Sequence, residues 1–510
     1  MLPLSYRACA ESDLTVQTIG HYLDGALSLG TSGLSAPVFN PATGAQQAEV
    51  ALGSIADVDA VVASAVTAFE SWRGSSLSTR ASIMFKFREL MDASRNELAE
   101  LVSLEHGKVP SDALGEIARG MENVEFACGI PALLKGEYSE QVAGGVDVYS
   151  LRQPLGVVAG ITPFNFPAMV PMWMFANAIM CGNCFILKPS EKDPSAALFM
   201  AKLLSEAGLP PGVFNVLQGD KVAVDRLLEH PQVKALSFVG YTPIARYVYE
   251  TGSAQGKRVQ ELGGAKNHML VLADADINAA ADAAVSAAYG SAGERCMAIS
   301  VVVAVGAVAD ELIPALTERI AKIVVGPGTD PKAEMGPLVT RQHCDKVTSY
   351  LDGAEQAGAT ILVDGRDVSL LGDGYFLGAS LIDNVTPEMQ LYQDEIFGPV
   401  LALMRVDTYE EGLALINSNP YGNGTAIFTR DGGVARRFQF EVEAGMVGIN
   451  VPIPVPVAAY SFGGWKSSLF GDLHMYGPDG VKFYTRNKVV TSRWPDPATS
   501  SVNLGFPVHK

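Results

Sequence analysis

The sequence predicts an α/β protein with a doubly wound parallel sheet, because short apolar runs alternate with helical stretches along it. Four apolar runs are typical of strands: residues 156–162, 185–188, 214–217 and 235–240. Helical stretches such as residues 195–207 lie between them. This alternation favours parallel strands with helical crossovers, the architecture that binds nucleotides. No Gly-x-Gly-x-x-Gly follows the first strand, so any dinucleotide must be held differently from the common fingerprint.

Residues 54–140 precede this region and are mainly helical in pattern, with apolar side chains three and four apart over residues 79–105. A second alternating region begins near His268 and contains an alanine-rich helix that ends at Tyr289. Two further strands are expected in it, at residues 300–305 and 398–406. We therefore expect a second α/β domain.

Two strand-like segments, residues 146–155 and 481–490, could leave the body of the protein. An unpaired strand exposes a row of backbone hydrogen-bonding groups. We therefore expect these segments to pair with another subunit, in a homo-oligomer that is a dimer or a tetramer.

Length and composition indicate a well-cored protein of about three domains, since the chain has 510 residues. Apolar residues make up 48% and charged residues 18%. The formal net charge is −18, which repels polyanions. Nucleic acid and anionic membranes are therefore not expected partners.

Residues 168–187 are mostly apolar and long enough to span a bilayer. Pro167 and Pro171 interrupt this region, and Asn177 and Asn183 add polar groups to it. Two buried parallel strands joined by a buried helix fit this pattern better than a membrane span.

The six cysteines do not form a disulfide framework, and the N-terminal residues lack the apolar core of a signal peptide. We therefore expect a reducing, cytoplasmic location. Cys181 and Cys184 form a lone Cys-x-x-Cys in an apolar run, without a second cysteine pair or a histidine cluster. We interpret them as packing residues and expect no metal site.

Cys296 lies in Tyr-Gly-Ser-Ala-Gly-Glu-Arg-Cys-Met-Ala, where small residues allow a substrate to approach a thiol. Arg295 next to it can favour the thiolate, which is the nucleophilic form. The alternative is a buried structural cysteine. The Glu294–Arg295 pair favours exposure, because charged residues are seldom buried unpaired.

Four other runs carry candidate functional residues. They are Thr162-Pro-Phe-Asn-Phe-Pro, Lys188-Pro-Ser-Glu, Glu261-Leu-Gly-Gly-Ala-Lys-Asn and Glu395-Ile-Phe-Gly-Pro. Individually each run is a weak signal. Together, in this order and spacing, they closely resemble the aldehyde dehydrogenase superfamily, from about His21 to about Trp494.

Within that superfamily the chain looks closest to the CoA-acylating methylmalonate-semialdehyde dehydrogenases. The runs that carry this likeness are Arg119-Gly-Met-Glu-Asn-Val-Glu-Phe, Leu133-Leu-Lys-Gly-Glu-Tyr, Gly264-Ala-Lys-Asn-His, Gly290-Ser-Ala-Gly-Glu-Arg-Cys-Met-Ala and Phe462-Gly-Gly-Trp-Lys-Ser-Ser. The likeness implies an NAD-dependent enzyme that passes an acyl group to coenzyme A.

The resemblance implies three domain-like parts. A doubly wound NAD-binding domain would span residues 1–142 and 157–268, and an α/β catalytic domain residues 269–472. A small β oligomerisation element with the tail would take residues 143–156 and 480–510.

The resemblance also assigns roles to single residues. Cys296 would be the nucleophile, and the Asn165 amide with the Cys296 backbone N–H would bind the oxyanion. Without the resemblance, Asn165 could equally be a loop-stabilising side chain. Residues implied to bind NAD are Thr162, Pro163, Phe164, Lys188, Glu191, Lys192, Gly240, Tyr241, Gly263, Glu395 and Phe397.

Arg119 and Arg295 match the positions where this branch binds the carboxylate of its substrate. Without that likeness, Arg119 fits an ordinary surface ion pair with Glu116 or Glu122. The implied reaction oxidises malonate or methylmalonate semialdehyde, releases CO2 and gives acetyl-CoA or propionyl-CoA.

Glu261 departs from the CoA-dependent branch, many members of which lack a glutamate there. A carboxylate at this position could activate water as a general base, point away, or assist proton removal from Cys296. A hydrolytic aldehyde dehydrogenase that releases a free acid is therefore the alternative. A non-catalytic protein reusing the fold is a third hypothesis, which the complete set of candidate residues disfavours.

Overall fold

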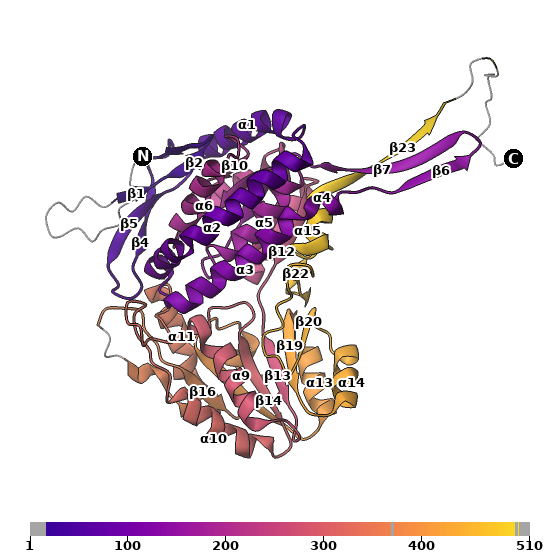
Figure 1. Cartoon of the computed structure of the whole chain (residues 1–510). Helices are drawn as coiled ribbons and strands as arrows, with labels where there is room; N and C mark the ends of the chain where they lie inside the picture. Colours follow the sequence, from indigo (N-terminus) through magenta and orange to yellow (C-terminus); the bar gives the residue numbers. More distant parts are fainter. Residues whose placement is uncertain (1–16, 369–371, 495–497, 499–510) are drawn as a thin grey trace.

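The computed structural model describes residues 17–368, 372–494 and 498. Two bodies, each built on a sheet covered by helices, lie next to each other, and a three-stranded arm leaves the first body (Figure 1). The fold class expected from the sequence is confirmed. Residues 1–16 of the expected NAD-binding domain lie outside the described residues. So do residues 495–497 and 499–510 of the expected tail.

The first body contains an eight-stranded sheet in the order β22-β12-β11-β8-β9-β10-β2-β3. Five neighbouring strands in its centre run parallel: β8 (Val157–Ile161), β9 (Cys184–Lys188), β10 (Phe214–Val216), β11 (Val233–Val239) and β12 (Arg258–Leu262). The antiparallel edges are β2 (His21–Leu23), β3 (Ala26–Ser28) and β22 (Leu469–Phe470).

Strand β8 lies between β9 and β11, so the chain leaves β8 first toward one edge of the sheet and later toward the other. A crevice at the carboxyl ends of such strands is where doubly wound sheets bind ligands. The helices of this body are α1 (Ile55–Trp72), α2 (Leu77–His106), α3 (Pro110–Cys128), α4 (Ile130–Leu133), α5 (Met169–Met180), α6 (Ser195–Glu206), α7 (Lys221–Glu229) and α8 (Thr242–Ala254).

The apolar stretch considered as a membrane span forms the wholly buried helix α5 and most of β9, and β8 precedes it. This is the buried strand-helix-strand unit that the prolines and asparagines predict. Among the described residues, no helix is long and apolar enough to cross a membrane.

The second body contains a seven-stranded sheet in the order β15-β16-β17-β14-β13-β19-β20, parallel except for β15. Its strands are β13 (Asn267–Val271), β14 (Ile299–Val305), β15 (Thr360–Val363), β16 (Ser380–Asp383), β17 (Val400–Val406), β19 (Gly424–Phe428) and β20 (Met446–Ile449). Its helices are α9 (Ile277–Tyr289), α10 (Val308–Ile320), α11 (Arg341–Ala354), α12 (Gln390–Gln393), α13 (Tyr409–Ser418) and α14 (Gly432–Glu441).

The arm consists of β6 (Tyr138–Ala143), β7 (Val146–Pro154) and β23 (Thr485–Arg493), and it projects from the body in Figure 1. The expected second strand starts later than predicted, because residues 477–483 form helix α15 (Gly477–Phe483). Gly477, Gly480 and Val481 are buried in this helix, at the spacing of three and four residues that places side chains on one helical face.

Small sheets complete the structure: β1 (Gln17–Ile19), β4 (Ser35–Phe39) and β5 (Gln46–Ala51) form one, and β18 (Tyr421–Gly422) and β21 (Trp465–Lys466) another. Two 3-10 turns occur at Gly290–Gly293 and Gly365–Val368.

Candidate active site

Cys296 lies in the loop between α9 and β14, and it is half-buried. The loop turns sharply after Tyr289, because Ser291, Ala292 and Gly293 all have positive φ angles of 54°, 52° and 74°. A Cβ at Gly293 would collide with the Gly398 carbonyl, so this position requires glycine. The turn that leads to Cys296 thus has a backbone conformation that few residue types adopt readily.

Burial raises the pKa of the Cys296 thiol to about 12, and the nearby Glu395 carboxylate acts in the same direction. The backbone N–H groups of Cys296 and Met297 and the Arg295 guanidinium lower this pKa. Arg295 therefore favours the thiolate, as the sequence predicts, but burial outweighs it in the free protein. The thiol is protonated at neutral pH in this state.

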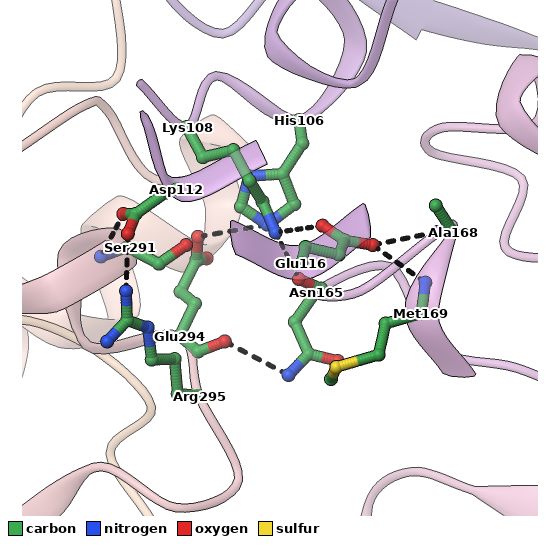
Figure 2. Close-up of polar contacts among 10 residues, drawn as sticks. All are labelled: His106, Lys108, Asp112, Glu116, Asn165, Ala168, Met169, Ser291, Glu294 and Arg295. Carbon is green, nitrogen blue, oxygen red and sulfur yellow. Dashed lines mark hydrogen bonds and ion pairs between the residues drawn. The ribbon is translucent and has the colours of Figure 1, made fainter. Parts of the chain in front are cut away.

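Arg295 also connects two elements. Its guanidinium forms an ion pair with Asp112 in the first turn of α3, and Asp112 accepts the Ser291 N–H at 2.9 Å. One carboxylate thus fixes both the arginine and the turn that carries Cys296 (Figure 2).

Asn165 follows β8 and is 3% exposed, and its side-chain Nδ2 donates to the Glu294 carbonyl at 3.0 Å. Its own backbone carbonyl accepts from Lys108 Nζ at 2.7 Å. The Asn165 amide therefore contacts the loop of Cys296, while Lys108 fixes the Asn165 backbone (Figure 2).

Lys108 forms an ion pair with Glu116 at 2.7 Å, and both side chains are completely buried. The other Glu116 oxygen accepts the N–H groups of Ala168 and Met169, at 2.8 and 3.1 Å, at the start of α5. This pair therefore fixes the chain on both sides of the Asn165 loop. Glu116 is not the partner of Arg119, one of the two alternatives that the sequence left open.

Glu294 is fully buried, which contradicts the exposure expected for the Glu294–Arg295 pair. Burial raises the pKa of Glu294 well above its usual value, which favours the neutral form of this carboxyl. It accepts the Val339 N–H at 3.3 Å. His106 and His343 lie 3.8 Å from it, and burial lowers the pKa of both imidazoles.

A pocket beside the thiol is lined by Cys296, Arg295, Glu395, Phe397 and Asn267, among others. Burial raises the pKa of Glu395 to about 7, and one of its oxygens accepts the Ala265 N–H at 2.9 Å. The Phe397 ring meets the Phe164 ring edge-on at 5.9 Å. The run of Glu395 and the run of Asn165 therefore come together, as the resemblance implies.

The carboxyl ends of β8 and β9 bring the first cofactor candidates together. The Thr162 N–H donates to the Lys188 carbonyl at 3.1 Å, and the Thr162 hydroxyl is buried with no partner among the described residues. Lys188 Nζ lies 3.4 Å from Glu191, and Lys192 is 3.7 Å from it. Although burial opposes it, Lys188 holds the pKa of Glu191 below its usual value.

The remaining cofactor candidates lie at the ends of β11 and β12. The Gly240 N–H donates to the Leu262 carbonyl at 3.1 Å, and Tyr241, just before α8, is 56% exposed. A Cβ at Gly263 would come within 2.7 Å of the Ser467 carbonyl oxygen. Pro163 borders Thr162 on the half-buried part of the same loop.

Glu261 is the last but one residue of β12, and both its carboxyl oxygens are buried without a hydrogen-bond partner among the described residues. Burial raises its pKa to about 9. Glu261 is not among the residues that line the pocket of Cys296.

Arg119 donates to both oxygens of Glu122 and to the carbonyls of Val455 and Pro456. Tyr476 donates to the same Pro456 carbonyl at 3.2 Å. Burial raises the pKa of Tyr476; Arg119 lowers it and Cys296 raises it. Arg119 and Cys296 therefore act on the pKa of one tyrosine in opposite directions, and the hydrogen-bonded carboxylate of Arg119 is Glu122, the surface partner that the sequence alone favours.

Several residues of this site carry no signal that the sequence analysis used. They are Lys108, Asp112, Asn423 and Tyr476. Asn267 lies in two of the runs quoted from the sequence, but the sequence alone assigns no role to it. The sequence offers a local clue only for Lys108, because Gly107 before it and Pro110 after it mark the break between two helices. In the structure Gly107 has a φ of 92°, and Pro110 is the first residue of α3. The others meet the site through tertiary contacts.

Residues 30–490 match the model of the aldehyde dehydrogenase family. With its two α/β bodies and a cysteine loop between them, the chain belongs to this family.

The chain is 54% identical, over 96% of its length and 99% of the relative, to a malonate-semialdehyde dehydrogenase of Pseudomonas aeruginosa. A solved methylmalonate-semialdehyde dehydrogenase of Oceanimonas doudoroffii matches with a TM-score of 0.94 and 56% identity, covering 95% of this chain and 99% of that one. A Sinorhizobium meliloti protein assigned as a methylmalonate-semialdehyde dehydrogenase, complexed with NAD, matches with a TM-score of 0.94 and 53% identity, covering 96% and 100%.

Proposed function

We propose that this protein oxidises malonate or methylmalonate semialdehyde with NAD and transfers the acyl group, after loss of CO2, to coenzyme A. The observation that carries the proposal is the half-buried Cys296 on a strained loop that the Asn165 amide contacts. The names of the relatives supply the substrate class.

In the first step, the Cys296 thiol loses its proton to solvent, the sulfur forms a bond to the aldehyde carbon, and the carbonyl π electrons move to the oxygen. The Asn165 Nδ2 and the Cys296 N–H would donate to this oxyanion, and each such donor contributes roughly 2.7–4 kcal/mol. An asparagine suits this role because it donates without a charge of its own.

The residues at the carboxyl ends of β8 and β9 fit a dinucleotide. The orphaned Thr162 hydroxyl can bond to a bound ligand, and Lys188 with Glu191 would hold the adenosine ribose. Glu191 would accept ribose hydroxyls and repel a 2′-phosphate, which favours NAD over NADP. Glu395 would hold the nicotinamide ribose.

The other cofactor contacts are part of the same proposal. Residues proposed to lie along the dinucleotide are Pro163, Phe164, Lys192, Gly240, Tyr241, Gly263 and Phe397. NAD, when bound, would accept the hydride that leaves the thiohemiacetal carbon.

The oxyanion then re-forms a carbonyl, and Cys296 carries a thioester. The β-carboxylate of this acyl group leaves as CO2, and its bonding electrons pass to the α-carbon, which takes up a proton. The thiolate of coenzyme A attacks the thioester carbon and releases the Cys296 sulfur. The sum is semialdehyde, NAD⁺ and CoA giving acyl-CoA, CO2 and NADH.

Arg119 and Arg295 would bind the substrate carboxylate. Arg119 already presents its guanidinium to a carboxylate, Glu122, which a bidentate ligand could replace. Its electrostatic link with Cys296 through Tyr476 supports a place near the nucleophile.

The state of Glu261 supports coenzyme A over water as the acyl acceptor. With a pKa of about 9, its carboxyl is protonated at neutral pH and cannot take a proton from water. The alternative, a hydrolytic enzyme that releases a free acid, needs Glu261 ionised and beside the thioester.

We also propose the domain division expected from the sequence, with residues 1–142 and 157–268 binding NAD and residues 269–472 carrying the nucleophile. Residues 143–156 and 480–510 would form the oligomerisation element of a homo-oligomer. A cytoplasmic location belongs to the same proposal.

One assay tests the proposal. Enzyme, NAD and methylmalonate semialdehyde are incubated with and without CoA, and the products are identified by mass. We expect propionyl-CoA with CoA and, without it, about one equivalent of NADH per active site. Free acid at the full rate without CoA would favour the hydrolytic alternative, and undiminished NADH formation by Cys296→Ala would remove the proposed nucleophile.

A further inference from the structure

The backbone carbonyl of Cys296 accepts two side-chain amides. Asn267 Nδ2 donates to it at 2.9 Å, and Asn423 Nδ2 donates at 3.0 Å. Asn267 lies at the start of β13 and Asn423 next to the start of β19, two neighbouring strands. Both asparagines are buried, with 3% and 5% of their surfaces exposed.

Further contacts fix the orientation of these amides. The second Asn267 N–H donates to the Ala298 carbonyl at 2.9 Å, and its Oδ1 accepts the Gly424 N–H at 3.0 Å. Asn423 Nδ2 also lies 3.1 Å from the Met297 sulfur. The Asn267 amide is therefore oriented by β19 as well as by the loop, whereas the Asn423 amide contacts the loop at both Cys296 and Met297.

The clamped carbonyl belongs to the same planar peptide unit as the N–H of Met297. Fixing the oxygen therefore fixes the direction in which this N–H points. That N–H and the N–H of Cys296 both act on the thiol and favour its ionised form. A carbonyl that accepts hydrogen bonds also polarises its own peptide unit, which strengthens the N–H as a donor.

The charged and titratable groups that act on the thiol are few and are already placed. Glu395 opposes ionisation, Arg295 favours it, and Tyr476 is coupled to the same sulfur. The two asparagines add no charge to this set.

We propose that Asn267 and Asn423 are positioning residues, which hold the Cys296–Met297 peptide so that its N–H faces and stabilises the Cys296 thiolate. This inference rests on the proposed role of Cys296 as the nucleophile. It concerns the readiness of the thiol and is independent of which aldehyde or acyl acceptor is used.

The test measures alkylation of Cys296 by iodoacetamide from pH 6 to 10, with the modified peptide quantified by mass, in the full-length protein. The variants are Asn423→Ala and Asn267→Ala. We expect alkylation at pH 8 to fall about tenfold, which corresponds to a thiol pKa about one unit higher. Because the pKa of the parent thiol is about 12, this deficit should stay nearly constant from pH 6 to 10, and the single-turnover rate of NADH formation should fall in parallel with little change in KM.

Asn215→Ala is the matched control, because Asn215 is fully buried and its Nδ2 donates to the Gly212 carbonyl at 2.9 Å, in the first sheet. This variant should lose stability without a change in the pH profile. If an alanine variant fails to fold, Asn423→Ser or Asn267→Ser replaces it, since a serine hydroxyl is too short to reach the carbonyl.

Unchanged alkylation and NADH profiles in folded variants would overturn the inference. Cys296→Ala separates the two claims: if it retains NADH formation, the proposed function fails. If it abolishes NADH formation while the asparagine variants behave as Asn215→Ala does, the positioning role alone fails.

Discussion

Two loops meet at this site, and the groups that hold them differ. The Asn165 loop, from the first sheet, is fixed by the completely buried ion pair of Lys108 and Glu116. The Cys296 loop, between α9 and β14, is fixed at its start by the Asp112 carboxylate, which pairs with Arg295, and at the Cys296 carbonyl by the neutral amides of Asn267 and Asn423. Burial favours the neutral form of its own carboxyl, Glu294.

The difference follows from what each loop has to do. An asparagine donor keeps its charge state throughout the reaction, so a permanent ion pair behind it changes nothing. A thiol must ionise, and a fixed unit charge about 4 Å away would contribute roughly 4 kcal/mol at an effective dielectric constant of 20. That equals about three pKa units. Neutral amides orient the nucleophile without imposing such a shift.

Lys108→Met should lower the free energy of unfolding more than the other variants, because it leaves the Glu116 carboxylate buried without a partner. Breaking a buried pair in this way costs about 3–5 kcal/mol. The measurement is chemical denaturation of the variant against the parent protein.

Its control is the double variant Lys108→Met with Glu116→Gln, which removes both charges and should recover part of that loss. If Lys108→Met unfolds at the same denaturant concentration as the parent, the ion pair is not what holds the Asn165 loop.

Asn165→Ala should lower kcat by about 10²- to 10³-fold, because it removes one oxyanion donor. The structural cost should be small, since the side chain makes a single hydrogen bond, to Glu294. Single-turnover NADH formation measures the loss, and Asn215→Ala serves as a matched asparagine control. A kcat within threefold of the parent would leave Asn165 as a residue that merely supports its loop.

The sequence predicts the parts of this comparison that are local. The alternation of apolar runs and helices predicts both sheets, and the loop after β8 with Asn165 stands where expected. The boundary of β23 was wrong because Val481 and Phe483 fit both a strand and a short helix, and packing against α5 decides.

The residues that hold the two loops could not be predicted, because they contact residues that are distant in the sequence. Lys108 and Asn165 are 57 residues apart, and Asn423 and Cys296 are 127 apart. The expected exposure of Glu294 failed because a carboxyl can also be buried in its neutral form, which no sequence pattern reveals.

Arg119→Ala tests whether Arg119 binds the carboxylate of the substrate. We expect KM for a carboxylated aldehyde to rise about 10- to 100-fold, since hydrogen bonds to a charged group contribute about 1.5–3 kcal/mol. KM for propanal should hardly change. Glu122→Gln is the matched control, because it frees Arg119 and should not weaken binding of the carboxylated substrate. Equal effects of Arg119→Ala on both aldehydes would reject the carboxylate clamp.

Glu261→Gln tests whether a neutral carboxyl also occurs at the end of β12. The folded-state pKa of about 9 lies above the usual value, so the unfolded chain releases its proton first as the pH rises. This contribution to stability is therefore full below about pH 4.5 and is lost between there and pH 9, by up to about 1.4 kcal/mol per pH unit.

Removing the titrating group should therefore flatten the stability profile. We expect the midpoint of unfolding of Glu261→Gln to exceed that of the parent more at pH 8 than at pH 5, while CoA-dependent turnover is kept. Parallel profiles for the two proteins would show that Glu261 is already ionised. In that case the carboxylate could act as a base, and a simultaneous loss of free-acid formation in the variant would assign the acyl acceptor to water.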